Sequence, residues 1–550
     1  MISATARSKR GPYKRRISLC WLLLATFLWR ADPIRAADDP LAARVIILAN
    51  SDDPDSLRIA RHYAEVRSVP PANIFALRMP VTETVTWREF VATIWHPLLT
   101  ELVRAKWIDA IPMSLADPVG RQKYAPFGHR IAALVVCRGV PLKINHDALL
   151  YSDVPPFTAR TEFRTNAGAV DAELSLLSLP NYPINAFVPN PLFQNDRPAA
   201  HELTQVVKVS RLDGPTADAA HALVDRAVQA EKTGLLGRAY VDLSERDPVG
   251  NAWLEAAAKQ LGELGFDLSV DRDPATLRAT ARFDAPALYF GWYASDLDGP
   301  FTLPGFQFPP GAIALHIHSY SAATLRSAST GWTGPLVARG VTATVGNVHE
   351  PYLQLTHRPD ALLRALARGA TLVDAAYYAL TALSWQAVLI GDPLYRPFAV
   401  PLGEQLKPPP ETPSPLTAYA ILRQVNVLEA EGRRDEAVAL ARAAQTSAPS
   451  LAIGLALARR LHAGGDNDAA ASALGFAGVA KTFAPNEWAL AREAAQFLES
   501  AGRPRRALEI WQTLLAIPAL PAELRAAWLP EARKAALAAK DDAQAEAWNL

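Results

Sequence analysis

The segment GAIALHIHSYSAATLR, residues 311–326, is the part of the chain that most resembles an active-site strand. Strand alternation would place His316 and His318 on one face. Histidines at this spacing lie about 7 Å apart and can share a metal ion if a neighbouring element adds a third ligand, such as His349 or Glu350. The alternative is one hydrogen-bonded core histidine and one loop histidine, and no H-E-x-x-H motif favours the metal site.

The same region could also hold a nucleophile. In an open parallel sheet, ligands bind beyond the carboxyl ends of the strands. Three predicted strand ends, YFGWYASD, HIHSYSA and GNVHEPY, bring polar and aromatic side chains to such an edge: Trp292, Tyr293, Asp296, His318, Ser319, Ser321, His349, Glu350 and Tyr352. Ser319 would be the nucleophile of a hydrolase, with His318 or His349 as its base. Glu350 would be the orienting carboxylate. The Gly-x-Ser-x-Gly turn that strains a nucleophilic serine is missing.

A crevice without a working nucleophile would bind its ligand rather than cleave it. The binding candidates are Trp292, Tyr293, His349 and Asp392. Asp392 lies in GDPLYRP, which is most simply a turn in which the aspartate stabilises the backbone. Cys137 lies in an apolar strand pattern and is expected to be a core thiol. No P-loop and no Gly-x-Gly-x-x-Gly motif follows a strand, so no nucleotide or other cofactor is predicted.

The elements that would position these residues belong to an α/β fold. Short apolar runs rich in β-branched residues alternate with helical patterns over residues 42–400, as in parallel βαβ units. One series spans residues 42–235 and includes a long irregular insertion at about 147–200. A second series spans residues 236–400. Two series of similar size predict either one doubly wound domain with two halves or a two-lobed α/β domain.

The chain changes character after a proline-rich linker at residues 401–415, which contains six prolines. Residues 416–550 are rich in Ala, Leu, Arg and Glu, and a Gly-x-x-x-x-Ala pattern recurs as GRRDEA, GDNDAA and GRPRRA, with a degenerate copy KDDAQA. Successive alanines of this pattern are 33, 37 and 38 residues apart, close to the roughly 34-residue period of tetratricopeptide repeats. The pattern predicts an all-α, tetratricopeptide-like domain; the alternative is a non-repetitive Ala-rich bundle.

The first residues have the order of a secretory signal peptide, predicted at residues 1–37. A basic stretch precedes the apolar run ISLCWLLLATFLW, and small residues follow it. The run is 13 residues long, shorter than the roughly 20 that a membrane span needs. Cleavage after Ala36 or Ala37 would leave an exported protein, periplasmic or extracellular, with no membrane span. Only Cys137 would remain, so no internal disulfide could form.

The overall charge argues against a partner that binds through attraction to the net charge of the chain. The chain has 56 Lys and Arg against 55 Asp and Glu, a net charge of +1. No summed field then favours nucleic acid or an acidic membrane surface, and we expect no nucleic-acid partner.

Several motifs together resemble a known but uncharacterised family of exported bacterial proteins that co-occurs with exosortase systems. They are SLRIARHYAEVRSVPPANI, VVCRGVPLKI, DAELSLL, GWYASDLDGPF, GAIALHIHSYSAATLR, TVGNVHEPYL and WQAVLIGDPLYRPF. The resemblance covers residues 42–400. It implies no activity, because the family has none established.

A more distant similarity is to the gingipain-like, caspase-type α/β peptidases. In those enzymes a His-Gly follows one strand, the nucleophilic Cys follows the next, and a Gly-Asp-Pro segment closes the domain. Here Trp292 falls at the first position, and Ser319 or Ser321 at the second. The similarity implies a caspase-like fold without the catalytic Cys and His.

These observations predict an exported cell-envelope protein that binds or scaffolds rather than cleaves. Its degenerate peptidase-like domain would recognise a polymer or peptide at the crevice, and its repeats would bind a protein partner. The alternative is a peptidase-like hydrolase that uses Ser319.

Overall fold

The computed structural model describes residues 41–150, 161–179, 182–407 and 414–549. The predicted signal peptide lies outside these residues, as does the triple proline of the linker. Within the described ranges, no helix combines the length and the apolar character that a membrane crossing requires.

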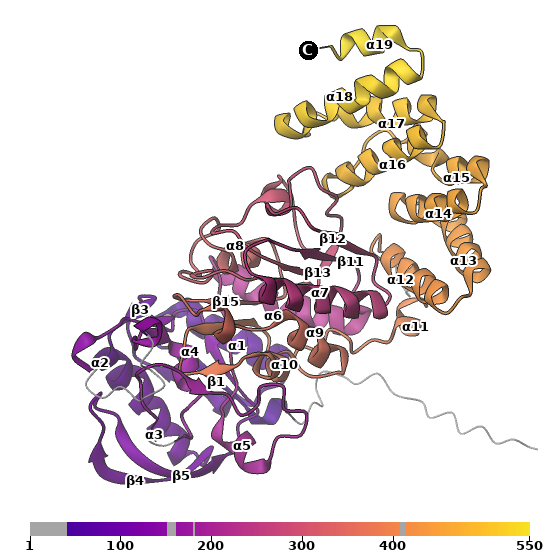
Figure 1. The fold of residues 1–550 in the computed structure, drawn as a ribbon. Helices are drawn as coiled ribbons and strands as arrows, with labels where there is room; N and C mark the ends of the chain where they lie inside the picture. The colour runs from indigo at the N-terminus through magenta and orange to yellow at the C-terminus, as the bar shows by residue number, and fades with distance from the viewer. Residues whose placement is uncertain (1–40, 151–160, 180–181, 408–413, 550) are drawn as a thin grey trace, which may run out of the picture.

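A ten-stranded, mostly parallel sheet forms the centre of the chain before the linker (Figure 1). In sheet order its strands are β12 (Leu268–Asp271), β11 (Arg238–Asp242), β13 (Pro286–Gly291), β14 (Ile313–His316), β15 (Ala343–Asn347), β17 (Ala387–Gly391), β10 (Val209–Leu212), β6 (Ala133–Cys137), β1 (Val45–Asn50) and β2 (Ile74–Leu77). The predicted α/β class is confirmed, and both βα series contribute to one continuous sheet.

The last strand of the chain's α/β part joins the two series. Strands β12 to β15 are parallel neighbours, and so are β10 to β2. β17 lies between these runs and is antiparallel to β15, with Ala343 opposite Gly391 and Asn347 opposite Ala387. The carboxyl end of β17 therefore lies at the edge where β15 begins.

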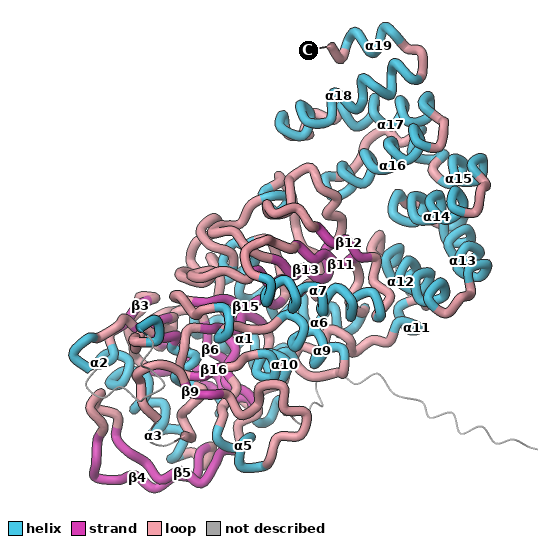
Figure 2. The backbone as a smooth tube through the Cα atoms, viewed as in Figure 1, coloured by secondary structure: helices cyan, strands magenta, loops and turns pink. Residues whose placement is uncertain are grey.

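Helices and three small sheets surround this sheet (Figure 2). The helices are α1 (Pro54–Val66), α2 (Trp87–Phe90), α3 (His96–Arg104), α4 (Val170–Leu174), α5 (Ala200–Gln205), α6 (Ala217–Thr233), α7 (Pro248–Glu263), α8 (Thr333–Ala338), α9 (Pro359–Ala367), α10 (Leu372–Ala379) and, after the sheet, α11 (Leu402–Gln405). The small sheets pair β4 (Ile108–Ala116) with β5 (Gln122–His129), β3 (Thr84–Val85) with β7 (Lys143–Ile144) and β8 (Gly168–Ala169), and β9 (Val188–Pro189) with β16 (Ala382–Leu383).

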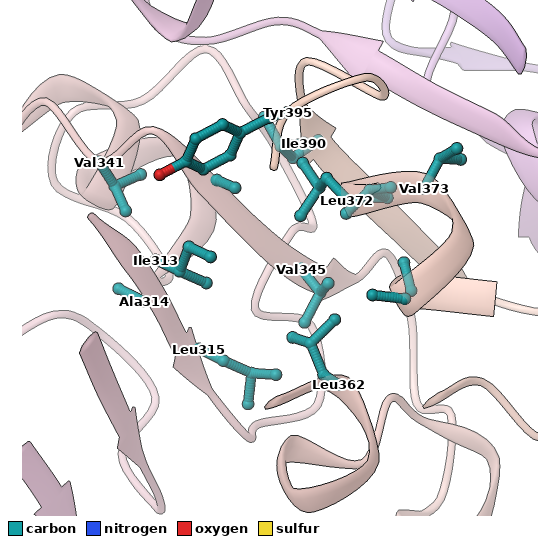
Figure 3. Packing of buried hydrophobic residues seen from close by; sticks show 14 of the residues in the cluster. Ile313, Ala314, Leu315, Val341, Val345, Leu362, Leu372, Val373, Ile390 and Tyr395 are labelled. Atoms are coloured by element: carbon teal, nitrogen blue, oxygen red, sulfur yellow. The ribbon is translucent and has the colours of Figure 1, made fainter. Parts of the chain in front are cut away.

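Both faces of the central strands are buried, which explains why their sequences are apolar throughout. On β1, Ile46 and Leu48 belong to a core with α2 and α3, whereas Ile47 and Ala49 belong to a core with α1 and α6. Figure 3 shows the second core farther along the sheet, where Leu362 of α9 lies near Leu315 of β14 and Val345 of β15. This packing fixes the strands whose ends carry the candidate site.

After the linker, the described residues contain helices and no strands (Figure 2). They are α12 (Thr417–Ala430), α13 (Arg434–Ser447), α14 (Leu451–Ala463), α15 (Asn467–Ala473), α16 (Trp488–Ser500), α17 (Pro504–Ala516), α18 (Ala522–Ala538) and α19 (Asp542–Ala547). We refer to them as the helical region. Its hydrophobic core is separate from the cores around the sheet, except that Ala285, just before β13, also packs in it.

The four copies of the Gly-x-x-x-x-Ala pattern have the same local structure. Gly432, Gly465 and Gly502 have φ of +80°, +86° and +72° in turns between helices, a region that favours glycine. Lys540, which begins the degenerate copy, has φ of +59°. The alanines at the end of each copy are buried: Ala437, Ala470, Ala507 and Ala545. Each copy thus places a left-handed residue in a turn and a small residue in the core.

Within the residues that the structure describes, the helical region touches the α/β domain in two places. Near α12, Tyr419 donates to Asp284 at 2.5 Å and Arg423 donates to the Leu264 carbonyl at 2.7 Å. Near α16 and α18, a cavity of about 270 Å³ is lined from both sides, by Phe306 and neighbours and by Trp488 and Trp528. An ion pair at 3.6 Å joins Arg282 to Glu493 there.

Candidate functional site

The loops that follow β13, β14 and β15 meet at one edge of the sheet, because these three strands are parallel neighbours. The Ile317 N–H donates to the Gly291 carbonyl at 2.8 Å, and the Tyr320 N–H donates to the His349 carbonyl at 2.9 Å. The Tyr293 and His318 rings lie 4.3 Å apart. We call the residues of loops 292–296, 317–321 and 348–352 the strand-end site.

His316 is a core residue beneath this site. Only 2% of it is exposed, and its ring stacks on Trp332 at 3.5 Å. Its Nε2 accepts from the Ala294 N–H at 3.0 Å, so Nδ1 carries the proton and donates to the Tyr289 hydroxyl, also at 3.0 Å. Burial holds the pKa of His316 well below its usual range. Both ring nitrogens are occupied by protein groups, which leaves neither available to a metal.

The predicted pairing of His316 with His318 required the strand to continue, and β14 ends at His316. His318 lies in the following loop, where its Nδ1 donates to the carbonyl of Ser319. Within the described residues, no group of three His, Cys, Asp or Glu side chains is arranged to hold a metal ion. The geometry therefore gives the metal site no support.

A buried hydrogen-bond chain continues from His316 to an aspartate that sequence analysis did not single out. The Tyr289 hydroxyl, which accepts from His316, donates to Asp242 Oδ2 at 3.1 Å. Burial raises the pKa of Asp242 to about 7, against hydrogen bonds from Leu277 and Tyr289. Asp242 ends β11, and the signal that could have pointed to it is an acidic residue closing the apolar run GRAYVDLS.

The predicted hydrolase triad is not joined by hydrogen bonds. The Ser319 hydroxyl makes no hydrogen bond within the described part of the chain, and His318 uses Nδ1 on the Ser319 carbonyl. Glu350 accepts from the Tyr352 N–H at 3.2 Å. Ser321 is fully buried, and its hydroxyl accepts from the Asn347 N–H at 3.0 Å. His318 and Ser319 share the loop after β14, and Glu350 lies on the loop after β15, but within the described residues no base is bonded to the Ser319 hydroxyl.

The four predicted binding residues differ in their surroundings. Trp292 is 2% exposed, and its Nε1 donates to Asn251 at 2.9 Å beside α7. Tyr293 is partly exposed and lies 4.7 Å beneath the guanidinium of Arg246. His349 is partly exposed, yet its Nε2 is buried without a hydrogen-bond partner. Tyr293 and His349 are thus the two that can meet a ligand.

Asp392 does not join the strand-end site. It follows β17 and so lies at the opposite edge of the sheet. Its carboxylate is fully buried, accepts from the Tyr63 hydroxyl at 3.1 Å and pairs with Arg67, which also pairs with Glu231 at 2.6 Å. These contacts attach the end of β17 to α1 and α6, a structural role.

Charged side chains from the first series hold the loop after β14 in place. Glu83 accepts from the Thr324 hydroxyl at 2.5 Å and from the Leu325 N–H at 2.8 Å. Lys143, from β7, donates to the Ala323 carbonyl at 2.6 Å. Loops that follow β2 and β6 therefore meet the loop that follows β14. Sequence reasoning missed these contacts because they join residues about 180 to 240 positions apart.

No family model matches the chain, and no match was found to a curated protein or to a solved structure.

Proposed function

We propose that this is an exported cell-envelope protein that binds a polymer or peptide at the strand-end site and a protein partner through its helical region. The observation that carries the proposal is the state of the strand-end side chains. Ser319 has an unbonded hydroxyl, and Tyr293 and His349 on the neighbouring loops are partly exposed, whereas within the described residues no base is bonded to the Ser319 hydroxyl. Such groups can bond to a ligand but are not arranged to cleave it.

Aromatic side chains at the same site favour a ligand with flat or apolar faces as well as polar groups. Tyr293 packs on His318, and Tyr320, 51% exposed, lies with its ring edge-on to His349 at 6.4 Å. Tyrosine offers contact area with a hydroxyl at its tip at little cost in conformational entropy. Peptides and polysaccharides both present flat or apolar faces next to polar groups.

The resemblance to caspase-type peptidases fits a degenerate relative. Trp292, where those enzymes carry histidine, is a buried residue that packs against Gly250 of α7. Ser321 is buried, and Ser319 has no base, so neither serine has the partner that would activate it. We propose a caspase-like fold that has kept its strand-end site and lost its catalytic pair.

The helical region is proposed to be tetratricopeptide-like. The repeated left-handed turn residues and buried alanines support this assignment. An open groove of about 740 Å³ lies between α13 and α14, lined by side chains such as Val438, Arg442 and Leu461. Because α12, α16 and α18 face the α/β domain, this groove is the surface we assign to a protein partner.

The ligand proposal is tested by screening the chain against a panel of oligosaccharides and a panel of peptides. A ligand of the strand-end site should bind at least about tenfold more weakly to Tyr293→Ala and His349→Ala. Tyr378→Ala, which removes a partly exposed tyrosine of α10, is the matched control and should bind normally. A ligand whose affinity none of these variants changes, or no ligand in either panel, would contradict the proposal.

The alternative, a serine hydrolase, rests on the free Ser319 hydroxyl beside two histidines. A fluorophosphonate probe distinguishes the two functions, because it labels only activated serines. The binding proposal predicts no labelling of the chain. Labelling that Ser319→Ala abolishes and Ser329→Ala, in an exposed turn, leaves intact would establish the hydrolase instead.

A further inference from the structure

The two-stranded sheet of β4 and β5 packs on the core where it begins, at the buried Ile108, and residues 111–116 beyond it are all exposed. Tyr124 and Ala110 pack toward the core beneath α3, and Tyr124 meets Trp95 edge-on at 6.4 Å. Ile111 lies opposite Ala125 in register, so their side chains share the other face. The pairing shifts register beside Phe127 and again between Pro112 and Ala116, and the apolar side chains at these shifts, Met113, Leu115 and Phe127, are exposed as well.

That outer face is apolar and exposed. Ile111 is 59% exposed, Met113 39%, Leu115 56% and Phe127 72%. Soluble proteins leave single large apolar side chains exposed, but several on one short two-stranded ribbon indicate a contact surface. We call Ile111, Met113, Leu115, Ala125 and Phe127 the apolar ribbon face.

Basic residues border the apolar ribbon face. Lys123 lies on β5, and Lys106 and Arg130 lie where the two strands begin and end. None of these three cations is paired with a carboxylate in the described residues, and Asp109 is the one carboxylate within the two strands. The chain as a whole is almost neutral, with a net charge of +1, so this positive charge is local.

The size of the face argues against a second copy of the chain as its occupant. Two strands of about nine residues offer roughly 300 Å² on one face. A stable protein interface needs about 800 Å² on each partner. Binding to a lipid surface needs no such minimum area. Each apolar side chain that leaves water adds its own favourable free energy, and cations are attracted to anionic headgroups.

We propose that the apolar ribbon face is a docking surface for an anionic lipid bilayer. Ile111, Met113, Leu115 and Phe127 would enter the headgroup region, and Lys106, Lys123 and Arg130 would contact lipid phosphates. The ribbon lies at the end of the molecule opposite α17, α18 and α19 (Figure 1). Docking would hold the protein to the membrane surface without a spanning helix and direct the helical region away from it.

The test uses the chain from Asp38 onward, which keeps every described residue. It is mixed with phosphatidylcholine vesicles, with or without phosphatidylglycerol, and sedimented. We expect binding to the anionic vesicles that falls as salt is added. The double substitution Met113→Ser and Phe127→Ser should lower the partition coefficient by about a hundredfold. Lys123→Glu with Arg130→Glu should weaken binding to anionic vesicles.

The matched control replaces exposed apolar residues of the helical region, Val479→Ser and Leu537→Ser, and should bind as the parent does; Val479 is 80% exposed. Thermal unfolding of each variant checks that the fold is retained, which exposed positions should allow. Absence of vesicle binding by the parent overturns the proposal. So does a parent chain that is dimeric by sedimentation velocity and becomes monomeric in the double variant, since a second copy would then cover the face.

Discussion

At the scale of single residues, position relative to a strand end decides what a side chain can do. His316 is the last residue of β14 and is held on both nitrogens, whereas His318, two residues later, lies in a loop against Tyr293. The sequence pattern could show that a strand passes here but not where it stops. A pair expected to act together was therefore separated into a core residue and a surface residue.

Asp242 gives a residue-scale prediction about pH. Its pKa is about 7 in the folded protein because of burial, far above the value near 4 of an unfolded aspartate. The folded state therefore binds this proton more tightly than the unfolded state does. The stability that the protonated Asp242 contributes is fully present below about pH 4 and is lost as pH rises through about 7. Asp242→Asn cannot ionise. We expect it to match the parent below about pH 4 and to be more stable by up to about 4 kcal/mol above about pH 8.

Urea unfolding of both proteins across this pH range measures the difference. Asp109→Asn, at an exposed position of β4, is the control and should leave the pH profile of the parent unchanged. Parallel profiles for the parent and Asp242→Asn would show that the pKa of Asp242 does not change on folding.

At the scale of elements, the repeated turns of the helical region make a second prediction. Lys540 occupies the position that glycine holds in the other three copies, with φ of +59°. A left-handed conformation costs a lysine about 1 kcal/mol that glycine avoids, although glycine also loosens the unfolded chain. Lys540→Gly should therefore stabilise the protein by about 0.5 to 1 kcal/mol in chemical denaturation.

Lys534→Gly provides the opposite control, because Lys534 lies inside α18 and glycine there should cost about 1 kcal/mol. If both substitutions destabilise the protein, the turn at Lys540 does not require the conformation that its three counterparts adopt.

Elements with strong local patterns could be predicted from the sequence, and those defined by distant contacts could not. The apolar, β-branched run ARVIILAN at residues 43–50 is typical of a buried strand and contains β1, and the helical pattern of residues 361–368 overlaps α9. The place of β17 depends on pairing with β15 and β10, which no local pattern records. The contacts of Glu83 and Lys143 with the loop after β14 are equally long-range, so that part of the strand-end site became visible only in three dimensions.

At the scale of the whole molecule, buried polar contacts attach the helical region to the α/β domain. Asp284 is buried with Arg282 and Arg238, and Tyr419 reaches it from α12. Burial alone would raise the pKa of Asp284, but the two guanidinium groups hold it below its usual range. The carboxylate is therefore charged, and each hydrogen bond that it accepts stabilises that buried charge.

Tyr419→Phe removes one of those donors and should destabilise the contact by about 1.5 to 3 kcal/mol, the usual worth of a hydrogen bond to a buried charge. Hydrogen exchange should become faster in α12 and in residues 279–285. Tyr378→Phe, which removes a hydroxyl bonded at 3.0 Å to the exposed Asp196, is the control and should change little. Unchanged exchange near α12 would mean that apolar packing alone holds the two parts together.

The two attachments of the helical region also have a mechanical consequence. A row of packed helices that is attached to a domain at one end only can bend as a unit, whereas attachment at two points restricts that motion. Here α12 is attached near Asp284, and α16 and α18 pack beside Phe306. The helices between them are therefore held at both ends. The groove between α13 and α14 lies on that span, and its width is then set by the α/β domain rather than by the repeats themselves.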